Sequence, residues 1–441
     1  MVVVALLALP AVTSGAPAPN GEAAAPGGAW RSRFTWHLEG KLGIRSSREV
    51  RLEGEYVPVP ARSGGGPVLV RETPDSGSSL ELSKIAVTFD AEITPDIRAG
   101  VKVHLLDLYD RNPTSSDDRV FLREAWVQFG RRDDVMTPSR ENSLYLLVGK
   151  APRFTKQRDR RLESYGLLSN AVGRFEQVQV QAGGGFGRHF YWRAHLANPN
   201  PLFFRDPNAL AGDNGIPDAE IGSAYGTGFV MLYDAKAVDI NFSGQFEAGG
   251  GAGLRFMSED GSGSLDSFGW YFHRQLADRQ PLRGTSISGD LELLLGGGIP
   301  LPISGRDKTE LGFTTKGRIR DLRFYAQVAQ QDIAGLKRRG YELELAYFFE
   351  LPGLCASGDT PVVNWIQPAL RYSSIDNLFT APHDYPYPAI AWDWTKLDFG
   401  FRIGIIRGVD VTVEYSRHSM KLEEGGVLHP DEFLTTLRVS H

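Results

Sequence analysis

The chain has 441 residues, a formal net charge of −5 and a pI near 6.0, and this charge excludes a protein that binds nucleic acid through its whole surface. Its single cysteine, Cys355, excludes an intramolecular disulfide and a metal cluster ligated by cysteines. The 50 glycines and the aromatic content of 11% are typical of many strands joined by tight turns.

The N-terminus resembles an export signal. An apolar core runs from Val2 to Val12 and small residues follow it, so we expect residues 1–25 to be a signal peptide with a small-residue leader. No later stretch reaches the roughly 18 consecutive apolar residues that a membrane-spanning helix needs. The choice is therefore between a soluble exported protein and an outer-membrane β-barrel, and periodicity decides between them.

Apolar and polar residues alternate with a period of two along much of the chain. In the first such segment, residues 33–44, Phe34, Trp36 and Leu38 share one face and polar residues occupy the other. This alternation is expected of a wall between lipid and a wet lumen. The same pattern predicts strands in 84–93, 97–109, 124–129, 177–181, 189–196, 229–233, 238–247, 286–295, 322–328, 341–349, 396–405, 409–415 and 433–439.

The lengths of these segments and of their connections predict a transmembrane barrel. The segments reach about 9 to 13 residues, which is enough to cross a bilayer at a tilt. Short connections (94–96, 183–187, 234–237, 317–321 and 407–408) alternate with long ones (45–79, 152–173, 198–223, 248–268 and 375–392). Short periplasmic turns and long outer loops are typical of outer-membrane barrels. We expect an all-β fold, a single transmembrane antiparallel β-barrel of about 16 to 18 strands over residues 30–441. Girdle aromatics are expected at Tyr109, Trp192, Tyr233, Tyr347 and Tyr415.

One stretch, residues 150–174, is basic although the whole chain is acidic. Its only acids are Asp159 and Glu163, and its cations are Lys150, Arg153, Lys156, Arg158, Arg160, Arg161 and Arg174. If the first strand runs upward, this stretch is the third outer loop. A solvated surface loop is the simplest interpretation of such a charge run. We favour a loop that folds into the barrel mouth and offers its arginines to passing anions.

The sequence around this stretch resembles the phosphate-selective porin O/P family. The resemblance rests on Val148-Gly149-Lys150, on the run from Pro152 to Gln157, on Arg174, and upstream on the run from Arg123 to Val127. It covers a small part of the chain. The resemblance implies a third loop that narrows the pore, basic side chains that guide anions, and assembly as a homotrimer.

The inward positions of the predicted strands also carry charge. Earlier strands place Lys84, Lys102, His104 and Arg193 there. Later strands place Asp239, Glu247, Asp290, Glu292, Glu310, Glu342 and Glu344 there. A basic wall facing an acidic wall would set up a transverse field that orients polar solutes in the pore. The alternative is that these charges pair across a wet lumen.

Catalytic and metal-binding interpretations find little support. The sequence has no G-x-S-x-G, HExxH or Walker motif. His189 and His195 lie about 20 Å apart along a strand, too far to share one metal. A serine triad built from distant segments stays open, but we predict no enzyme activity, no catalytic residue, no metal centre and no cofactor. Calcium is an option in loop 206–218 through Asp206, Asn208, Asp213, Asn214 and Asp218, although the EF-hand pattern is missing.

These observations predict a porin in the outer membrane of a Gram-negative bacterium. Its expected function is passive diffusion of small anionic, phosphate-like solutes, with outer-membrane lipid as its surroundings and no nucleic-acid partner. Arg153, Lys156, Arg158, Arg160 and Arg161 are the predicted constriction, and Lys150 and Arg174 are expected at the strand ends that anchor it. The alternative is a structural or adhesive barrel with a plugged lumen.

Overall fold

The structure is a computed structural model. It describes residues 33–47, 56–58, 67–69, 77–107, 120–131, 142–173, 176–198, 246–276, 301–351, 355–357, 360–382, 391–423 and 425–441. The predicted signal peptide, Arg174, Asp290, Glu292 and the predicted calcium loop 206–218 lie outside the described residues.

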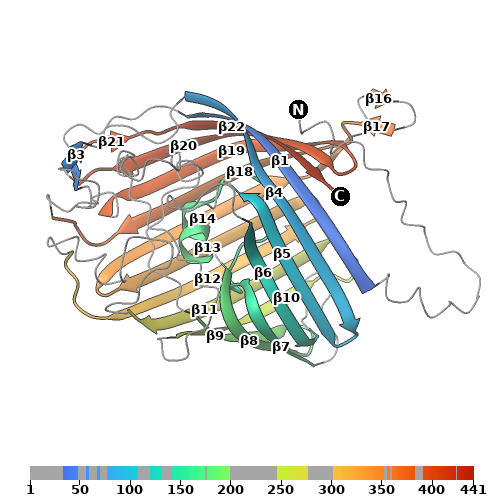
Figure 1. Ribbon diagram of the computed structural model, residues 1–441, viewed down its shortest axis with the longest axis horizontal. Coiled ribbons are helices and arrows are strands. Elements are labelled where there is room, and N and C mark those ends of the chain that lie inside the picture. The colour runs from blue at the N-terminus through green and yellow to red at the C-terminus, as the bar shows by residue number, and fades with distance from the viewer. Residues whose placement is uncertain are drawn as a thin grey trace, which may run out of the picture.

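Sixteen long strands form the wall of the molecule (Figure 1). They are β1 (Phe34–Ser47), β4 (Gly77–Thr94), β5 (Ile97–Asp107), β6 (Phe121–Gly130), β7 (Ser143–Pro152), β8 (Glu176–Phe186), β9 (Phe190–Ala197), β10 (Glu247–Met257), β11 (Gly263–Gln275), β12 (Asp307–Ile319), β13 (Leu322–Ile333), β14 (Leu336–Tyr347), β18 (Trp365–Asn377), β19 (Asp393–Ile406), β20 (Val409–Lys421) and β22 (Glu432–Ser440). Short β15 (Phe349–Glu350) and β21 (Val427–Leu428) join the same sheet, while β2 (Tyr56–Pro58) pairs with β3 (Pro67–Leu69) and β16 (Cys355–Ser357) pairs with β17 (Thr360–Val362).

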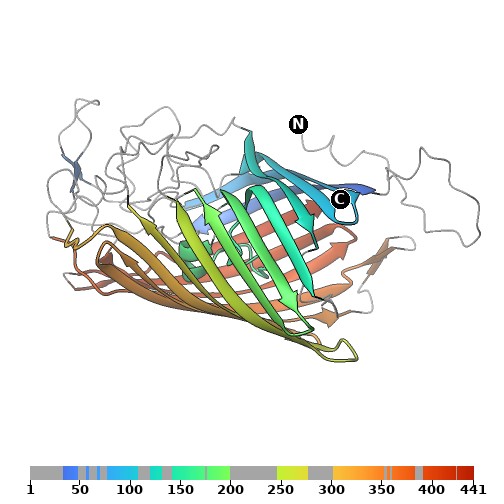
Figure 2. The ribbon, with the colours of Figure 1, turned by 90° about the horizontal axis from the view of Figure 1, so that it is seen from below.

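The wall is a closed ring. Each long strand pairs antiparallel with the next along the chain, from β4 with β5 through β9 with β10 to β20 with β22. The first strand, β1, pairs with both β4 and β22, which closes the sheet. Closure leaves no edge with unpaired backbone groups, as a structure surrounded by lipid requires. The predicted antiparallel barrel is confirmed, with 16 long strands, and Figures 1 and 2 show the tilted ring from two sides.

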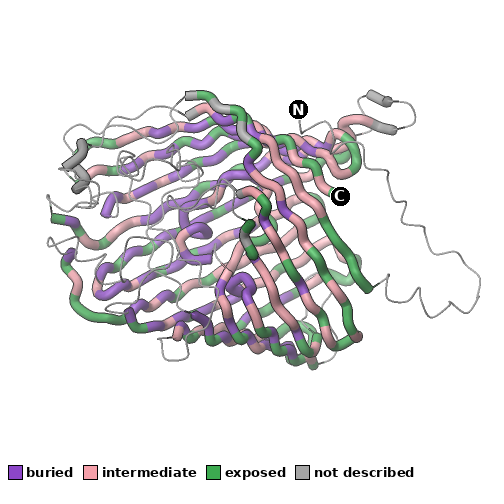
Figure 3. The backbone as a smooth tube through the Cα atoms, viewed as in Figure 1, coloured by how far each residue is buried: buried purple, intermediate pink, exposed green. Residues whose placement is uncertain are grey.

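The wall is apolar outside and polar inside. On β14, Tyr341, Leu343 and Leu345 are between 37% and 44% exposed, whereas Glu342 and Glu344 are at most 3% exposed. Figure 3 shows the same alternation between buried and exposed positions along the strands. A soluble protein places its polar residues outside, so this arrangement requires lipid around the wall. The chain is therefore an outer-membrane β-barrel of the kind found in Gram-negative bacteria. Of the predicted girdle aromatics, Tyr347 and Tyr415 are exposed and Trp192 is half-buried.

The prediction of a long loop at 248–268 is wrong. Residues 247–257 form β10 and residues 263–275 form β11, joined by a short turn. The glycines of β10 make this strand look like a loop in sequence. Side chains at Gly249 and Gly251 would collide with the rings of Phe272 and Phe268 from β11, so the glycines make room for these rings. The predicted strands at 229–233 and 286–295, and 238–247 up to residue 245, lie outside the described residues, and β9 pairs directly with β10.

The connections define two ends of the barrel. The turns after β4, β8, β10, β12 and β19 lie at the same end as the C-terminal end of β22, here called the turn end, and the opposite end is called the loop end. Short and long connections do not alternate strictly, because a two-residue turn joins β13 to β14 at the loop end. The one helix in the described part of the chain, α1 (Leu167–Gly173), lies inside the ring (Figure 1). No helix of the described residues is long and apolar enough to cross a membrane.

Candidate functional site

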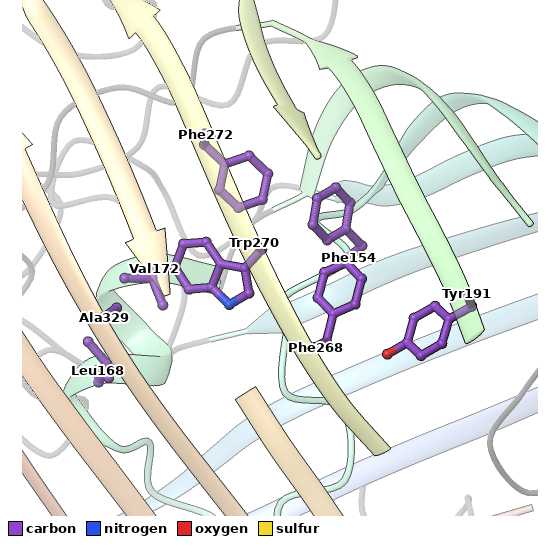
Figure 4. Close-up of a cluster of buried hydrophobic side chains, with 8 residues drawn as sticks. All are labelled: Phe154, Leu168, Val172, Tyr191, Phe268, Trp270, Phe272 and Ala329. Atoms are coloured by element: carbon purple, nitrogen blue, oxygen red, sulfur yellow. The ribbon is translucent and has the colours of Figure 1, made fainter. Parts of the chain in front are cut away.

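Residues 153–173, here called the pore loop, connect β7 to β8 and fold into the lumen. Leu168 and Val172 of α1 pack on Trp270 of β11 and Ala329 of β13, and Phe154 stacks on Phe272 at 5.0 Å between ring centroids. Figure 4 shows this apolar cluster between the loop and the wall. Burial of these apolar side chains stabilises the attachment of the loop to the wall through the hydrophobic effect. The predicted third loop therefore lies inside the barrel.

Arg153 fastens the first end of the pore loop. Its Nη2 donates to Glu247 Oε1 at 2.7 Å and its Nη1 donates to Glu310 Oε2 at 2.6 Å. Nη1 also donates to the carbonyl oxygen of Val172 at 2.9 Å, which ties the two ends of the loop together. The guanidinium lies 3.7 Å from the centre of the Phe272 ring. Breaking such a buried, paired charge is strongly destabilising. We call Arg153 and these contacts the near anchor.

Glu163 fastens the loop to the opposite wall. Its carboxylate accepts from Lys41 Nζ of β1 at 2.5 Å and from Arg402 Nη2 of β19 at 2.7 Å. The backbone N–H groups of Glu163 and Ser164 donate to the two oxygens of Glu414, each at 2.8 Å. Burial alone would raise the pKa of Glu163, but Lys41 and Arg402 hold it well below its ordinary value. These contacts form the far anchor.

Arg371 of β18 extends the far anchor. Its Nη2 donates to Ser164 Oγ at 2.6 Å and its Nε donates to Asp398 Oδ2 at 2.8 Å. Lys396 Nζ donates to the carbonyl oxygen of Tyr165 at 2.9 Å. The side chains of Arg371, Lys396 and Asp398 are fully buried. The pore loop thus crosses the lumen and is held at both walls by charge-assisted hydrogen bonds.

The two inward glutamates of β14 bind the backbone of the pore loop. Glu344 Oε1 accepts from the N–H of Arg161 at 3.1 Å, and Glu342 Oε2 accepts from the N–H of Ser169 at 3.0 Å. A side chain at Gly166 would collide with the carboxylate of Glu342, so the loop needs glycine at this close approach. Glu342 and Glu344 face inward as predicted, and both carboxylates bind the backbone of the pore loop.

The expected contrast between a basic and an acidic wall is wrong for the described strands. The later strands also bury cations, and Lys308 Nζ lies 3.0 Å from Glu310 Oε1. On the earlier wall, Lys84 Nζ lies 2.8 Å from Glu39 Oε1. An isolated buried charge is costly, and each of these two lysines has a carboxylate beside it. Lys102 is half-buried and His104 is buried on the same earlier wall.

The predicted constriction cations differ in their surroundings. Lys150 is buried in β7 and donates to the carbonyl oxygen of Leu122 at 2.7 Å. Lys156 is half-buried and paired with Glu176. Arg153 belongs to the near anchor. None of these three side chains is freely presented to solvent.

The other three arginines of the loop lie nearer the solvent. Arg158 is exposed, and Arg160 and Arg161 are half-buried. Arg160 lies 3.3 Å from the centre of the Tyr165 ring and donates to the carbonyl oxygen of Ser164 at 3.2 Å. In the described part of the chain, Arg158 and Arg161 have no ion pair within 4.0 Å.

A cavity of about 830 Å³ lies between the pore loop and the turn end. Ten cationic residues line it against three acids, Asp159, Asp266 and Glu344. The cations are Arg98, Arg131, Arg153, Lys156, Arg158, Arg161, Arg193, Lys316, Arg318 and Arg323. A low-dielectric wall focuses the field of such an excess and raises the local concentration of anions. Four of the cations come from the predicted constriction, and Arg193 was predicted in the lumen.

Sequence reasoning missed two site residues, Arg371 and Arg318. Arg371 lies in β18, for which the sequence analysis predicts no strand, although Ile366, Leu370 and Tyr372 alternate with Gln367 and Arg371 around Pro368. Arg318 was assigned to a turn and instead faces the cavity at the end of β12. The alternation around Pro368 was the available signal for Arg371.

No protein-family model matches the chain, and a search of curated proteins finds no match. Among solved structures, the outer membrane channel DcaP of Acinetobacter baumannii is similar, with a TM-score of 0.52 and 10% identity over 92% of this chain and 97% of that chain. OprB of Pseudomonas putida has a TM-score of 0.51 and 9% identity over 94% of this chain and 97% of that chain. At such identities the likeness shows the fold, a porin-type outer-membrane barrel.

Proposed function

We propose that this barrel is a passive diffusion channel for small anions. The carrying observation is the cavity with ten cations and three acids directly beneath a pore loop that is fastened to both walls. A fastened loop narrows the lumen at a defined place, and cations beside the remaining space attract anions. Basic linings are one way in which pores select ions.

The division of charge in the lumen supports this proposal. The anchors use their cations in short contacts with carboxylates, so these cations contribute little free field. Arg158 and Arg161 lack such partners in the described residues and line the cavity. Their long side chains can follow a passing anion without holding it tightly, which a conducting pore requires. The likeness to a protein described as an outer membrane channel supports the same class of function.

The proposal includes phosphate-like solutes among the small anions, because the cationic lining of the cavity attracts them as it attracts other anions. We also propose assembly as a homotrimer in outer-membrane lipid, which rests on the resemblance to the phosphate-selective porin O/P family. Chemical cross-linking of the folded protein in detergent, followed by denaturing electrophoresis, tests the trimer. A ladder that ends at three copies supports it, and a monomer at every cross-linker concentration contradicts it.

The test of the channel is the zero-current potential of the refolded protein in a planar bilayer under a KCl gradient. The wild type should prefer chloride over potassium, and the double variant Arg158→Ala, Arg161→Ala should show a smaller preference, because eight of the ten cations remain. Arg417→Ala is the matched control, because Arg417 is exposed on the lipid-facing side of β20. Cation preference in the wild type contradicts the proposal, and absence of conductance favours the plugged structural barrel.

A further inference from the structure

Two arginines lie opposite each other where β12 and β13 reach the turn end. Arg318 is the direct cross-strand partner of Arg323 in the register of these strands, and both line the cavity. Like charges directly opposite each other destabilise a strand pair. Among the described residues neither forms an ion pair, and Arg318 Nη2 donates only to the carbonyl oxygen of Gly261, at 2.5 Å. The described part of the chain therefore supplies this pair with no counter-charge within 4.0 Å.

A third guanidinium approaches from the pore loop. Arg161 lines the same cavity, and its pKa is lowered first by burial and then by the positive charge of Arg323. The nearest acid of β14, Glu344, is already engaged, because Oε1 accepts from the N–H of Arg161 at 3.1 Å and Oε2 accepts from Arg371 at 3.3 Å. Lys316 of β12 adds a fourth cation, with Asp266 3.9 Å away. The group has more positive charge than its neighbours balance.

A buried hydroxyl faces the same space. Tyr325 lies on β13 two residues after Arg323, on the same face, and its cross-strand partners are Lys316 and Glu344. The side chain is 7% exposed and lines the cavity, and its hydroxyl has no hydrogen-bond partner among the described residues. A buried donor without an acceptor is costly, so this hydroxyl is available to donate to an acceptor oxygen that enters the cavity.

We infer that Arg161, Lys316, Arg318, Arg323 and Tyr325 form a binding site for a small oxyanion with two negative charges. Guanidinium groups present paired N–H donors that match the oxygens of carboxylate, sulfate or phosphate. The phenol donates one further hydrogen bond, and chloride offers no comparable set of oxygens. The inference rests on the proposed channel function and deepens it, because it names the class of solute that pauses at this site on its way through.

The test measures how sodium sulfate reduces the chloride current of the refolded full chain in a bilayer at constant ionic strength. In the wild type the current should fall with sulfate and saturate. Tyr325→Phe removes one hydroxyl from a charged ligand and should raise the half-saturating sulfate concentration about tenfold, and Arg323→Gln should raise it further. Tyr347→Phe is the matched control, since Tyr347 faces outward on β14. Inorganic phosphate and succinate, titrated in the same way, separate tetrahedral oxyanions from dicarboxylates.

The outcomes separate this site from the channel function. If the wild type prefers anions in KCl but sulfate has no saturable effect, the oxyanion site is overturned and the channel proposal stands. If Tyr325→Phe binds sulfate like the wild type, the site is also overturned. If the barrel does not conduct, the channel proposal fails, and calorimetric titration of sulfate into the detergent-solubilised protein decides the site. Binding weakened by Tyr325→Phe supports it, and no binding overturns it.

Discussion

Arg153 and Arg158 lie five residues apart on the same loop and have opposite surroundings. Arg153 is 2% exposed and donates to two carboxylates and one carbonyl oxygen. Arg158 is exposed, lines the cavity and has no ion pair among the described residues. The comparison teaches that a basic pore loop uses part of its charge to hold itself in place. Only the remainder is presented to solutes.

A substitution in the near anchor should give the largest loss in the free energy of unfolding. Arg153→Ala leaves Glu247 and Glu310 buried beside one cation fewer, so we expect a loss of about 3 to 5 kcal/mol in the free energy of unfolding. Denaturant titration of the protein in detergent, followed by tryptophan fluorescence, measures this loss. A change below about 1 kcal/mol would mean that the guanidinium does not hold the loop.

The far anchor should give an intermediate and pH-dependent effect. Glu163→Gln removes the charge that Lys41 and Arg402 bind, and we expect a loss of about 2 kcal/mol at pH 7. Because the folded pKa of Glu163 is lowered, its contribution is complete above the ordinary glutamate value of about 4.3 and declines as the pH falls below that value. The same titration at pH 7 and pH 3 should show the gap between wild type and variant narrowing in acid. A gap that widens in acid would contradict this sign.

A substitution of Arg158, which lines the cavity, should give the smallest effect on stability. Arg158→Ala removes an exposed side chain without an ion pair in the described residues, so the free energy of unfolding should change by no more than about 0.5 kcal/mol. Denaturant titration beside Arg153→Ala makes the comparison direct. Equal losses in the two variants would show that the loop does not divide its charge as described.

Much of the barrel could be predicted from sequence, because the alternation of apolar and polar residues within each strand shows which side chains face outward and which face the lumen. The alternation from Tyr341 to Phe349 predicted that Glu342 and Glu344 face inward, and the structure places both there. The same periodicity cannot show what lies across the lumen. Glu163 meets Arg402 across 239 positions, and Arg371 meets Ser164 across 207 positions. No local pattern encodes such partners, so the anchors are visible only in the closed ring. The pair of Arg318 and Arg323 is local, but the sequence predicts a turn over 317–321 and so does not place Arg318 on a strand opposite Arg323.

Covalent modification of the pore loop tests most directly whether it lines the passage. Arg158→Cys in a Cys355→Ser background has a single thiol, and a charged methanethiosulfonate reagent can modify it while current flows through one barrel. We predict a stepwise fall in single-channel current for Arg158→Cys. Arg417→Cys, on the lipid-facing side of β20, should show no change. An unchanged current through modified Arg158→Cys, with labelling confirmed by mass, would contradict the account.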